Sequence, residues 1–160
     1  MTRFADLLRV LSSAEVEFIL VGGMAAVAHG SPRSTQDLDV VYRRATANLA
    51  KLVEALGQHH PYLRGAPPGL PFRFDVETLR AGLNFTLTTD LGWIDLLGEI
   101  TGGGCYEDLV AHSIPVGVFG LRCLVLDLDA LIRSKRAAGR PKDFEALAEL
   151  ETLRDRTDKP

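Results

Sequence analysis

The sequence has 160 residues, of which 46% are apolar, enough for the core of one folded domain. Lysine and arginine number 18 and aspartate and glutamate 21, so the formal net charge is −3. This balance neither requires nor excludes a nucleic-acid partner, because local patches decide such binding. We expect a cytoplasmic protein with no membrane partner, because the chain shows no signal-peptide pattern and no apolar stretch of ~20 residues. The two cysteines lack metal-ligand spacing, which argues against a zinc site or a disulfide scaffold.

The first half of the chain shows apolar patterns typical of short helices and strands. Helical recurrence favours helices, and short apolar or alternating runs favour strands. In chain order, we predict a helix over residues 3–13, a buried strand over 18–21 ending at Gly22-Gly23, a helix over 24–29, a half-buried strand over 37–42 and a helix over 45–56.

The second half begins with a segment rich in proline and glycine, residues 57–73, which we interpret as a loop long enough to be functional. The remaining elements follow from alternation, glycine breaks and capping residues. We predict a hairpin of strands over 83–88 and 92–97, a break at 102–104, strands over 114–119 and 121–126, a helix from Asp127 to Ala138, and a last helix from Pro141 to about Leu153.

These elements interleave without a regular strand–helix–strand rhythm. The pattern predicts an α+β fold with a mixed β-sheet, helices packed mainly on one face of the sheet, and additional C-terminal helices. We expect one domain over residues 1–160, with its core at about 16–126 and a helical segment at about 127–155.

Two aspartates, Asp37 and Asp39, lie one residue apart on a predicted strand. Alternate strand residues point to the same face, about 6.6 Å apart along the backbone. Two carboxylates ~4 Å apart repel by about 4 kcal/mol at an effective dielectric constant of ~20. Either solvent screens this repulsion, as for an ordinary surface pair, or a divalent cation such as Mg²⁺ removes it.

A third aspartate, Asp95, has only apolar residues on either side, from Trp93 to Leu97. A lone ionised carboxylate in a buried strand is costly unless it is paired or metal-bound. If its strand lies beside the first one, three carboxylates converge. Three are the minimum set for two metal ions ~3.5–4 Å apart; the alternative is a strand-end acid that faces solvent.

The glycine pair Gly22-Gly23 ends a predicted strand just before a helix. Such a turn lets backbone N–H groups approach a phosphate closely. Arg33, Ser34 and Thr35 precede the aspartate pair and could donate to the same phosphates, although Arg33 could instead pair with a surface acid.

Together these motifs resemble a known signature. Val21-Gly22-Gly23, followed after thirteen residues by Asp37-Leu38-Asp39-Val40, resembles the signature of the polymerase-β-like nucleotidyltransferase superfamily, and Ile94-Asp95-Leu96 resembles its third motif. Residues 29–37 and 135–143 are similar to the small prokaryotic branch, which includes minimal and type IV toxin-like nucleotidyltransferases. The resemblance spans roughly residues 16–150.

The resemblance implies roles for these residues. Asp37 and Asp39 would bind two Mg²⁺ ions, for which Mn²⁺ could substitute, while Asp95 would complete one metal site and help to deprotonate the acceptor. Gly22 and Gly23 would hold the triphosphate of an NTP. Lys135 would reach a phosphate or orient an acid, with Lys142 and Asp143 in support; without the resemblance, this basic cluster could equally be an ordinary helix end.

The implied activity is Mg²⁺-dependent transfer of a nucleoside monophosphate from an NTP to a hydroxyl. The toxin-like members favour a tRNA 3′ end as acceptor, with a cognate antitoxin protein restraining the enzyme. The second enzyme hypothesis is a small-molecule transferase of the aminoglycoside type, which the absence of a recognisable second domain weakens. The non-enzyme alternative is a non-catalytic module that binds a nucleotide or a partner.

Overall fold

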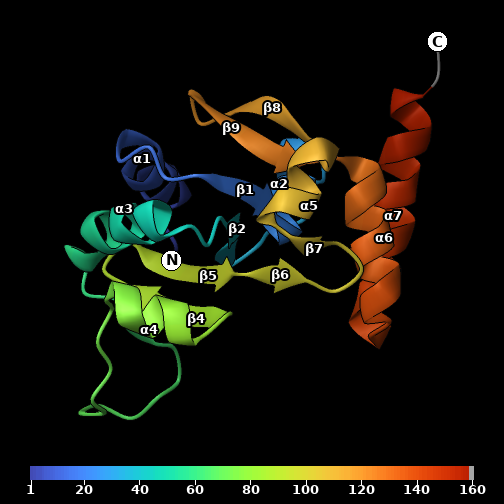
Figure 1. The fold of residues 1–160 in the computed structure, drawn as a ribbon. Coiled ribbons are helices and arrows are strands. Elements are labelled where there is room, and N and C mark those ends of the chain that lie inside the picture. The colour runs from blue at the N-terminus through green and yellow to red at the C-terminus, as the bar shows by residue number, and fades with distance from the viewer. Residues whose placement is uncertain (159–160) are drawn as a thin grey trace.

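The computed structural model describes residues 1–158, and its central feature is a seven-stranded mixed sheet in the order β3-β4-β5-β2-β1-β9-β8 (Figure 1). Strands β1 and β9 pair in parallel, as do β2 and β5, and the other neighbours are antiparallel. The strands are β1 Phe18–Val21, β2 Asp37–Tyr42, β3 Tyr62–Leu63, β4 Phe85–Thr89, β5 Gly92–Leu97, β8 Ser113–Val118 and β9 Leu121–Leu126, with β6 Glu99–Ile100 and β7 Gly104–Cys105 forming a separate pair.

Two groups of helices lie at opposite ends of this sheet, with α2 and α5 between them. Figure 1 shows α1 and α3 together at one end, and α6 beside α7 at the other. The helices are α1 Phe4–Ser13, α2 Gly22–Ala28, α3 Thr46–Gly57, α4 Val76–Ala81, α5 Tyr106–Leu109, the 3₁₀ turn η1 Val110–His112, α6 Leu128–Ala138 and α7 Pro141–Thr157. The predicted class, α+β with a mixed sheet and C-terminal helices, is confirmed. No helix within residues 1–158 has the length and apolar character needed to cross a membrane.

One cluster of buried apolar side chains joins the sheet to the helices. All four residues of β1 are buried, as expected for a strand between two neighbours, and the apolar face of α1 packs into the same cluster. Leu131 and Ile132 of α6 and Leu150 of α7 also belong to it. The C-terminal helices are therefore packed against the core next to the sheet.

The predicted boundaries at most elements lie within two residues of the observed ones. Asp127 caps α6 as predicted, since its carboxylate accepts a hydrogen bond from the Ala130 N–H at 2.8 Å. Gly139 follows that helix with a φ of 62°, a left-handed conformation that favours glycine. The last helix continues to Thr157, beyond the predicted end near Leu153.

Several short elements were not predicted. Helix α4 is capped by Asp75, whose carboxylate accepts from the Thr78 N–H at 2.8 Å, and β3 lies inside the segment that we interpreted as loop. The pair β6–β7 and helix α5 were also missed. Elements of two to six residues are too short to show a periodic apolar pattern, so tertiary contacts decide them.

Candidate functional site

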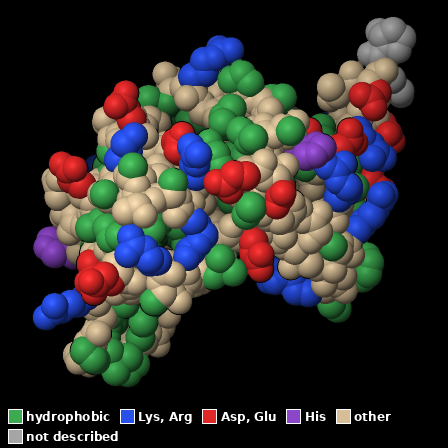
Figure 2. Space-filling view, viewed as in Figure 1, with side chains coloured by type: hydrophobic (Ala, Val, Ile, Leu, Met, Phe, Trp, Pro, Cys, Tyr) green, Lys and Arg blue, Asp and Glu red, His purple; other side chains and the backbone are tan. Residues whose placement is uncertain are grey.

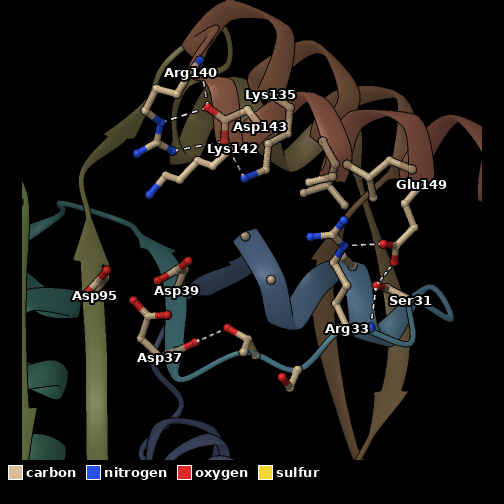
Figure 3. Close-up of a pocket in the computed structure, with 18 residues that line it drawn as sticks. Ser31, Arg33, Asp37, Asp39, Asp95, Lys135, Arg140, Lys142, Asp143 and Glu149 are labelled. Atoms are coloured by element: carbon tan, nitrogen blue, oxygen red, sulfur yellow. Dashed lines mark hydrogen bonds and ion pairs between the residues drawn. The ribbon is translucent and has the colours of Figure 1, made fainter.

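Three carboxylates converge at the centre of the sheet. Asp37 and Asp39 lie on β2, and the parallel register of β2 with β5 places Asp95 directly opposite Asp39. One carboxylate oxygen from each residue lies within 4.8 Å of the other two. The strand carrying Asp95 does lie beside the aspartate pair, so the condition for three converging carboxylates is met, and Figure 3 shows the three side chains along one wall of a pocket.

Burial and the charges of neighbouring carboxylates keep Asp39 and Asp95 from ionising freely. Burial raises the pKa of Asp39 to about 8, and the charges of Asp37 and Asp95 add to this effect. The Asp39 Oδ1 atom is buried and has no hydrogen-bond partner within residues 1–158. Burial also raises the pKa of Asp95, against the opposing charge of Arg64. A buried carboxylate oxygen without a partner, close to two others, is the donor set that a hard divalent cation prefers, so these residues fit Mg²⁺ or Mn²⁺.

The glycine pair forms the first turn of α2 and lies directly beside the carboxylates. Gly22 has a φ of 65°, and a Cβ at this position would overlap Asp39 Oδ2. A Cβ at Gly23 would lie 2.7 Å from Thr35 Oγ1, which is too close for a side chain. Glycine is therefore required here because helix α2 starts in contact with the aspartate pair, and this contact keeps the helix N-terminus beside the carboxylates.

A cavity of about 460 Å³ separates the carboxylates from the C-terminal helices. The first turn of α2 and the segment between α2 and β2 line it on one side, and α6 and α7 line it on the other. Every residue that the sequence singled out for catalysis, metal binding or nucleotide binding lines this cavity: Gly22, Gly23, Arg33, Ser34, Thr35, Asp37, Asp39, Asp95, Lys135, Lys142 and Asp143. Their roles toward a nucleotide stay predictions.

The cations on the far wall are organised by a buried aspartate. Asp143 is only 2% exposed, and it accepts from Lys135 Nζ at 3.2 Å and from Arg140 Nε at 2.9 Å. These hydrogen bonds, chiefly those from Arg140, lower the pKa of Asp143 to about 2. Figure 3 shows Lys135, Arg140 and Lys142 extending into the pocket, so Asp143 is placed to fix the direction of two of these cations.

Arg33 lies in the cavity but already has acidic partners. Its Nε donates to Glu149 Oε2 at 2.5 Å, and Glu145 lies 3.5 Å from Nη2. Ser31 donates to the other oxygen of Glu149. The alternative given above, in which Arg33 pairs with an acid, accounts for these contacts, and a phosphate would have to replace Glu149 as its partner.

The sequence reasoning did not identify Arg64, which lies at the carboxylates. Its Nη2 donates to Asp95 Oδ1 at 2.8 Å, its Nη1 lies 3.6 Å from Asp37 Oδ2, and its guanidinium stacks 4.7 Å from the centre of the Trp93 ring. Arg64 follows β3 in the segment over residues 57–73. The unusual length of that segment was the signal that it contributes to function, but nothing local distinguishes this arginine.

Comparison with known proteins gives matches in structure but not in sequence. No family model matches the chain, and no curated protein does. The solved structure of the lincosamide antibiotic adenylyltransferase LnuA, bound to lincomycin, aligns with a TM-score of 0.63 at 13% identity, covering 94% of this chain and 96% of LnuA. TM1012 of Thermotoga maritima, a candidate nucleotidyltransferase, aligns with a TM-score of 0.56 at 16% identity over 95% and 96% of the two chains.

A third structure, an antigenic nucleotidyltransferase-like protein from Paracoccidioides brasiliensis, has a TM-score of 0.54 at 13% identity and covers 93% of this chain and 72% of that one. Identities this low establish a common architecture and leave the activity of this chain to its own residues. The sheet topology, the carboxylate cluster on adjacent strands and these three alignments agree. The chain has the minimal nucleotidyltransferase fold.

Proposed function

We propose that this protein is a Mg²⁺-dependent nucleotidyltransferase, which transfers a nucleoside monophosphate from an NTP to a hydroxyl group and releases pyrophosphate. One observation carries this proposal. A single cavity has Asp37, Asp39 and Asp95 on one wall and a glycine turn with several cations around the rest. That combination suits a metal-bound triphosphate, whose negative charge the cations would balance.

In the proposed reaction, the acceptor oxygen attacks the α-phosphorus of the NTP. The bond from that phosphorus to the bridging oxygen breaks, and pyrophosphate leaves with the electron pair. The three aspartates would hold two Mg²⁺ ions, which when bound supply charge stabilisation for the attacking and leaving oxygens. Asp95 accepts the proton of the acceptor hydroxyl on its Oδ2 atom, because Arg64 already binds Oδ1.

The triphosphate would lie between α2 and the C-terminal helices. The backbone of Gly22 and Gly23 at the start of α2, and the hydroxyls of Ser34 and Thr35, line the cavity and would donate to phosphate oxygens from one side. Lys135 and Lys142 would approach from the other side, with Asp143 holding Lys135 in position. Arg33 would exchange Glu149 for a phosphate oxygen when the nucleotide binds.

For the acceptor, we propose a small hydroxylated molecule. LnuA is an adenylyltransferase of lincosamide antibiotics, and this chain aligns with 96% of its solved chain. A fold of this size is therefore compatible with a small acceptor. In addition, two acids lie among the cations of the C-terminal helices: Asp143 pairs with Lys135 and Arg140, and Glu151 pairs with Arg136.

A tRNA 3′ end, with a protein antitoxin that restrains the enzyme, is the second candidate. Lys142 lines the cavity and forms no ion pair within residues 1–158, so it is free to meet a backbone phosphate. On the face seen in Figure 2, however, basic side chains over α6 and α7 alternate with acidic ones. RNA binding depends mainly on an uninterrupted basic surface, which makes this candidate the weaker one.

One labelling screen tests both the activity and the acceptor. Purified protein would be incubated with Mg²⁺ and each α-³²P-labelled NTP, in parallel with total tRNA, with protein substrates and with a panel of hydroxylated small molecules that includes lincosamides and aminoglycosides. We expect label on a small molecule and release of unlabelled pyrophosphate. The double variant Asp37→Asn/Asp39→Asn is the inactive control, and label in that control would show a contaminating enzyme.

The outcomes separate the hypotheses. Label on tRNA alone would contradict the small-molecule acceptor and favour the toxin-like alternative. A search for a restraining partner protein would then follow. Binding of an NTP with Mg²⁺, measured by calorimetry, without transfer to any of the three acceptor classes would refute the enzyme and favour a nucleotide-binding module.

A further inference from the structure

A cation of the protein itself already lies among the carboxylates. The guanidinium of Arg64 is in contact with Asp95 at 2.8 Å and reaches Asp37 at 3.6 Å. Both distances are short enough for direct charge interaction. Lys135, which also acts electrostatically on Asp39, has its own ion pair with Asp143.

The rest of the arginine is fixed around this contact. Its backbone N–H donates to Thr86 O at 3.0 Å, which ties the residue to β4, and its Nη2 also donates to Leu87 O at 2.8 Å. The side chain is only 18% exposed, and its Nε is buried without a hydrogen-bond partner within residues 1–158. A guanidinium that gives up water and one hydrogen bond is retained because the carboxylates and the Trp93 ring compensate for the loss.

The two carboxylate contacts differ in strength. The Asp95 contact is a hydrogen bond, whereas the Asp37 contact, at 3.6 Å, is an ion pair without one. Asp37 is therefore the partner that Arg64 would lose first. A divalent cation bound by Asp37 and Asp39 would repel the guanidinium and neutralise the charge that attracts it.

We propose that Arg64 is a positioning residue for the metal site, which fixes Asp95 through its Oδ1 atom and competes with the divalent cation for Asp37. Metal binding then releases the Arg64–Asp37 contact, while the hydrogen bond to Asp95 holds that carboxylate in place. This inference rests on one part of the proposed function, the binding of the metal by the aspartates.

The competition makes a prediction that a purely structural role would not make. If Arg64 only stabilised the fold, its removal would lower both the stability of the protein and its metal affinity, because the carboxylates would lose their arrangement. If Arg64 competes with the metal, its removal lowers the stability of the metal-free protein but raises the metal affinity. The two measurements then change in opposite directions.

Arg44 provides a matched control. It also stacks on an aromatic ring, 5.7 Å from the centre of Tyr42, and it also donates to backbone carbonyls, those of Leu79 and Arg80. Within residues 1–158 it forms no ion pair with a carboxylate. Arg44→Met therefore removes similar packing and similar hydrogen bonds without changing the charge near the aspartates.

The experiment measures Mn²⁺ binding by electron paramagnetic resonance and thermal unfolding in EDTA, with no nucleotide present. For Arg64→Met we expect Mn²⁺ to bind about tenfold more tightly, a usual size for coupling between two binding events, together with a lower Tm in EDTA. Arg64→Lys, which keeps the charge, should bind Mn²⁺ like the unchanged protein. Arg44→Met should lower the Tm and leave the Mn²⁺ affinity unchanged.

The chain contains one tryptophan, so its fluorescence reports directly on Trp93. A guanidinium stacked on this ring should shift when Mg²⁺ binds. We expect Mg²⁺ to change the Trp93 emission of the unchanged protein and of Arg44→Met, with the same midpoint as binding, and to leave the emission of Arg64→Met constant.

Weaker or equal Mn²⁺ binding by folded Arg64→Met would overturn the proposal. If that variant does not fold, the fluorescence of the unchanged protein is the test. Trp93 emission that stays constant up to saturating Mg²⁺ would overturn the proposal as well. Failure of the proposed function can be told apart from failure of this proposal. If the Mn²⁺ affinities follow the predicted order but no nucleotide is transferred, the activity is contradicted and the role of Arg64 stands.

Discussion

The two walls of the cavity hold charge in opposite ways. The carboxylate wall, Asp37, Asp39 and Asp95, is built on adjacent central strands, and its like charges repel one another. The basic wall, Lys135, Arg140 and Lys142 on α6 and α7, contains its own counter-ion in Asp143. Burial raises the pKa of Asp39, whereas hydrogen bonds lower the pKa of Asp143, although both residues are aspartates facing one cavity.

The difference shows which wall depends on a ligand. Asp143 is buried but has hydrogen bonds from two cations, so this aspartate is satisfied without a bound molecule. Asp39 has a buried oxygen without a partner, and Arg64 supplies only part of the missing positive charge to its neighbours. Buried carboxylates without partners lower the stability of a protein, and such clusters are typical of functional sites.

The largest expected effect comes from Asp39→Asn. We expect the transfer rate to fall by about 10³-fold or more, since a metal ligand contributes several kcal/mol of transition-state stabilisation. In EDTA at pH 8 the same variant should be more stable by about 1–3 kcal/mol, because it removes a buried, repelled charge. Activity assays and chemical denaturation measure the two effects.

The exposed Asp155, which forms no ion pair within residues 1–158, is the control. Asp155→Asn should leave activity and stability unchanged. A loss of stability in Asp39→Asn would mean that the carboxylate wall is satisfied without a cation, and the comparison between the two walls would be wrong.

Asp143→Asn should have the reverse profile. It removes charged hydrogen bonds from Lys135 and Arg140, so we expect the free energy of unfolding to fall by about 1–3 kcal/mol. The KM for the NTP should rise several-fold while kcat changes less, because the cations lose their fixed direction.

The control is Asp129→Asn on the same pair of helices, where an exposed pair with Arg154 at 3.4 Å should contribute less than ~1 kcal/mol. An equal loss in both variants would contradict the role given to Asp143.

The smallest effect is a pH dependence that differs between the walls. Because the folded-state pKa of Asp39 lies above its usual value, at about 8, the metal-free protein should lose stability as the pH rises from ~4 to ~8. Saturating Mg²⁺ favours the ionised carboxylates, so the rise in Tm on adding Mg²⁺ should be larger at pH 8 than at pH 6. The pKa of Asp143, at about 2, gives stability that is present above pH ~4 and lost on acidification toward pH 2.

Thermal unfolding with and without Mg²⁺, across that pH range, measures both trends. In Asp39→Asn the loss of stability between pH 4 and 8 should be smaller than in the unchanged protein, and in Asp143→Asn the loss below pH 4 should be smaller. An increase in Tm on adding Mg²⁺ that does not depend on pH would argue that Asp39 is already ionised in the metal-free protein.

Residues close in sequence were the predictable part of the site. Asp37 and Asp39 share a strand, so their common face follows from alternation, and the glycine pair next to them follows from the end of an apolar run. The helix cap at Asp127 is equally local. Arg64 and Glu149 were not predictable, because each contacts a residue more than 30 positions away and neither lies in a recognisable pattern.

The order of residues along the chain was sufficient to determine the α+β class, the strands that carry the carboxylates and the glycine turn, because periodicity, capping and backbone freedom act over a few residues. Tertiary structure decided which strands are neighbours, that Asp143 rather than solvent holds Lys135 and Arg140, and that a guanidinium reaches Asp95 and Asp37. The physical reason is that burial and charge pairing depend on which distant segments pack together. The same residue type, aspartate, is therefore unsatisfied on one wall of this cavity and fully paired on the other.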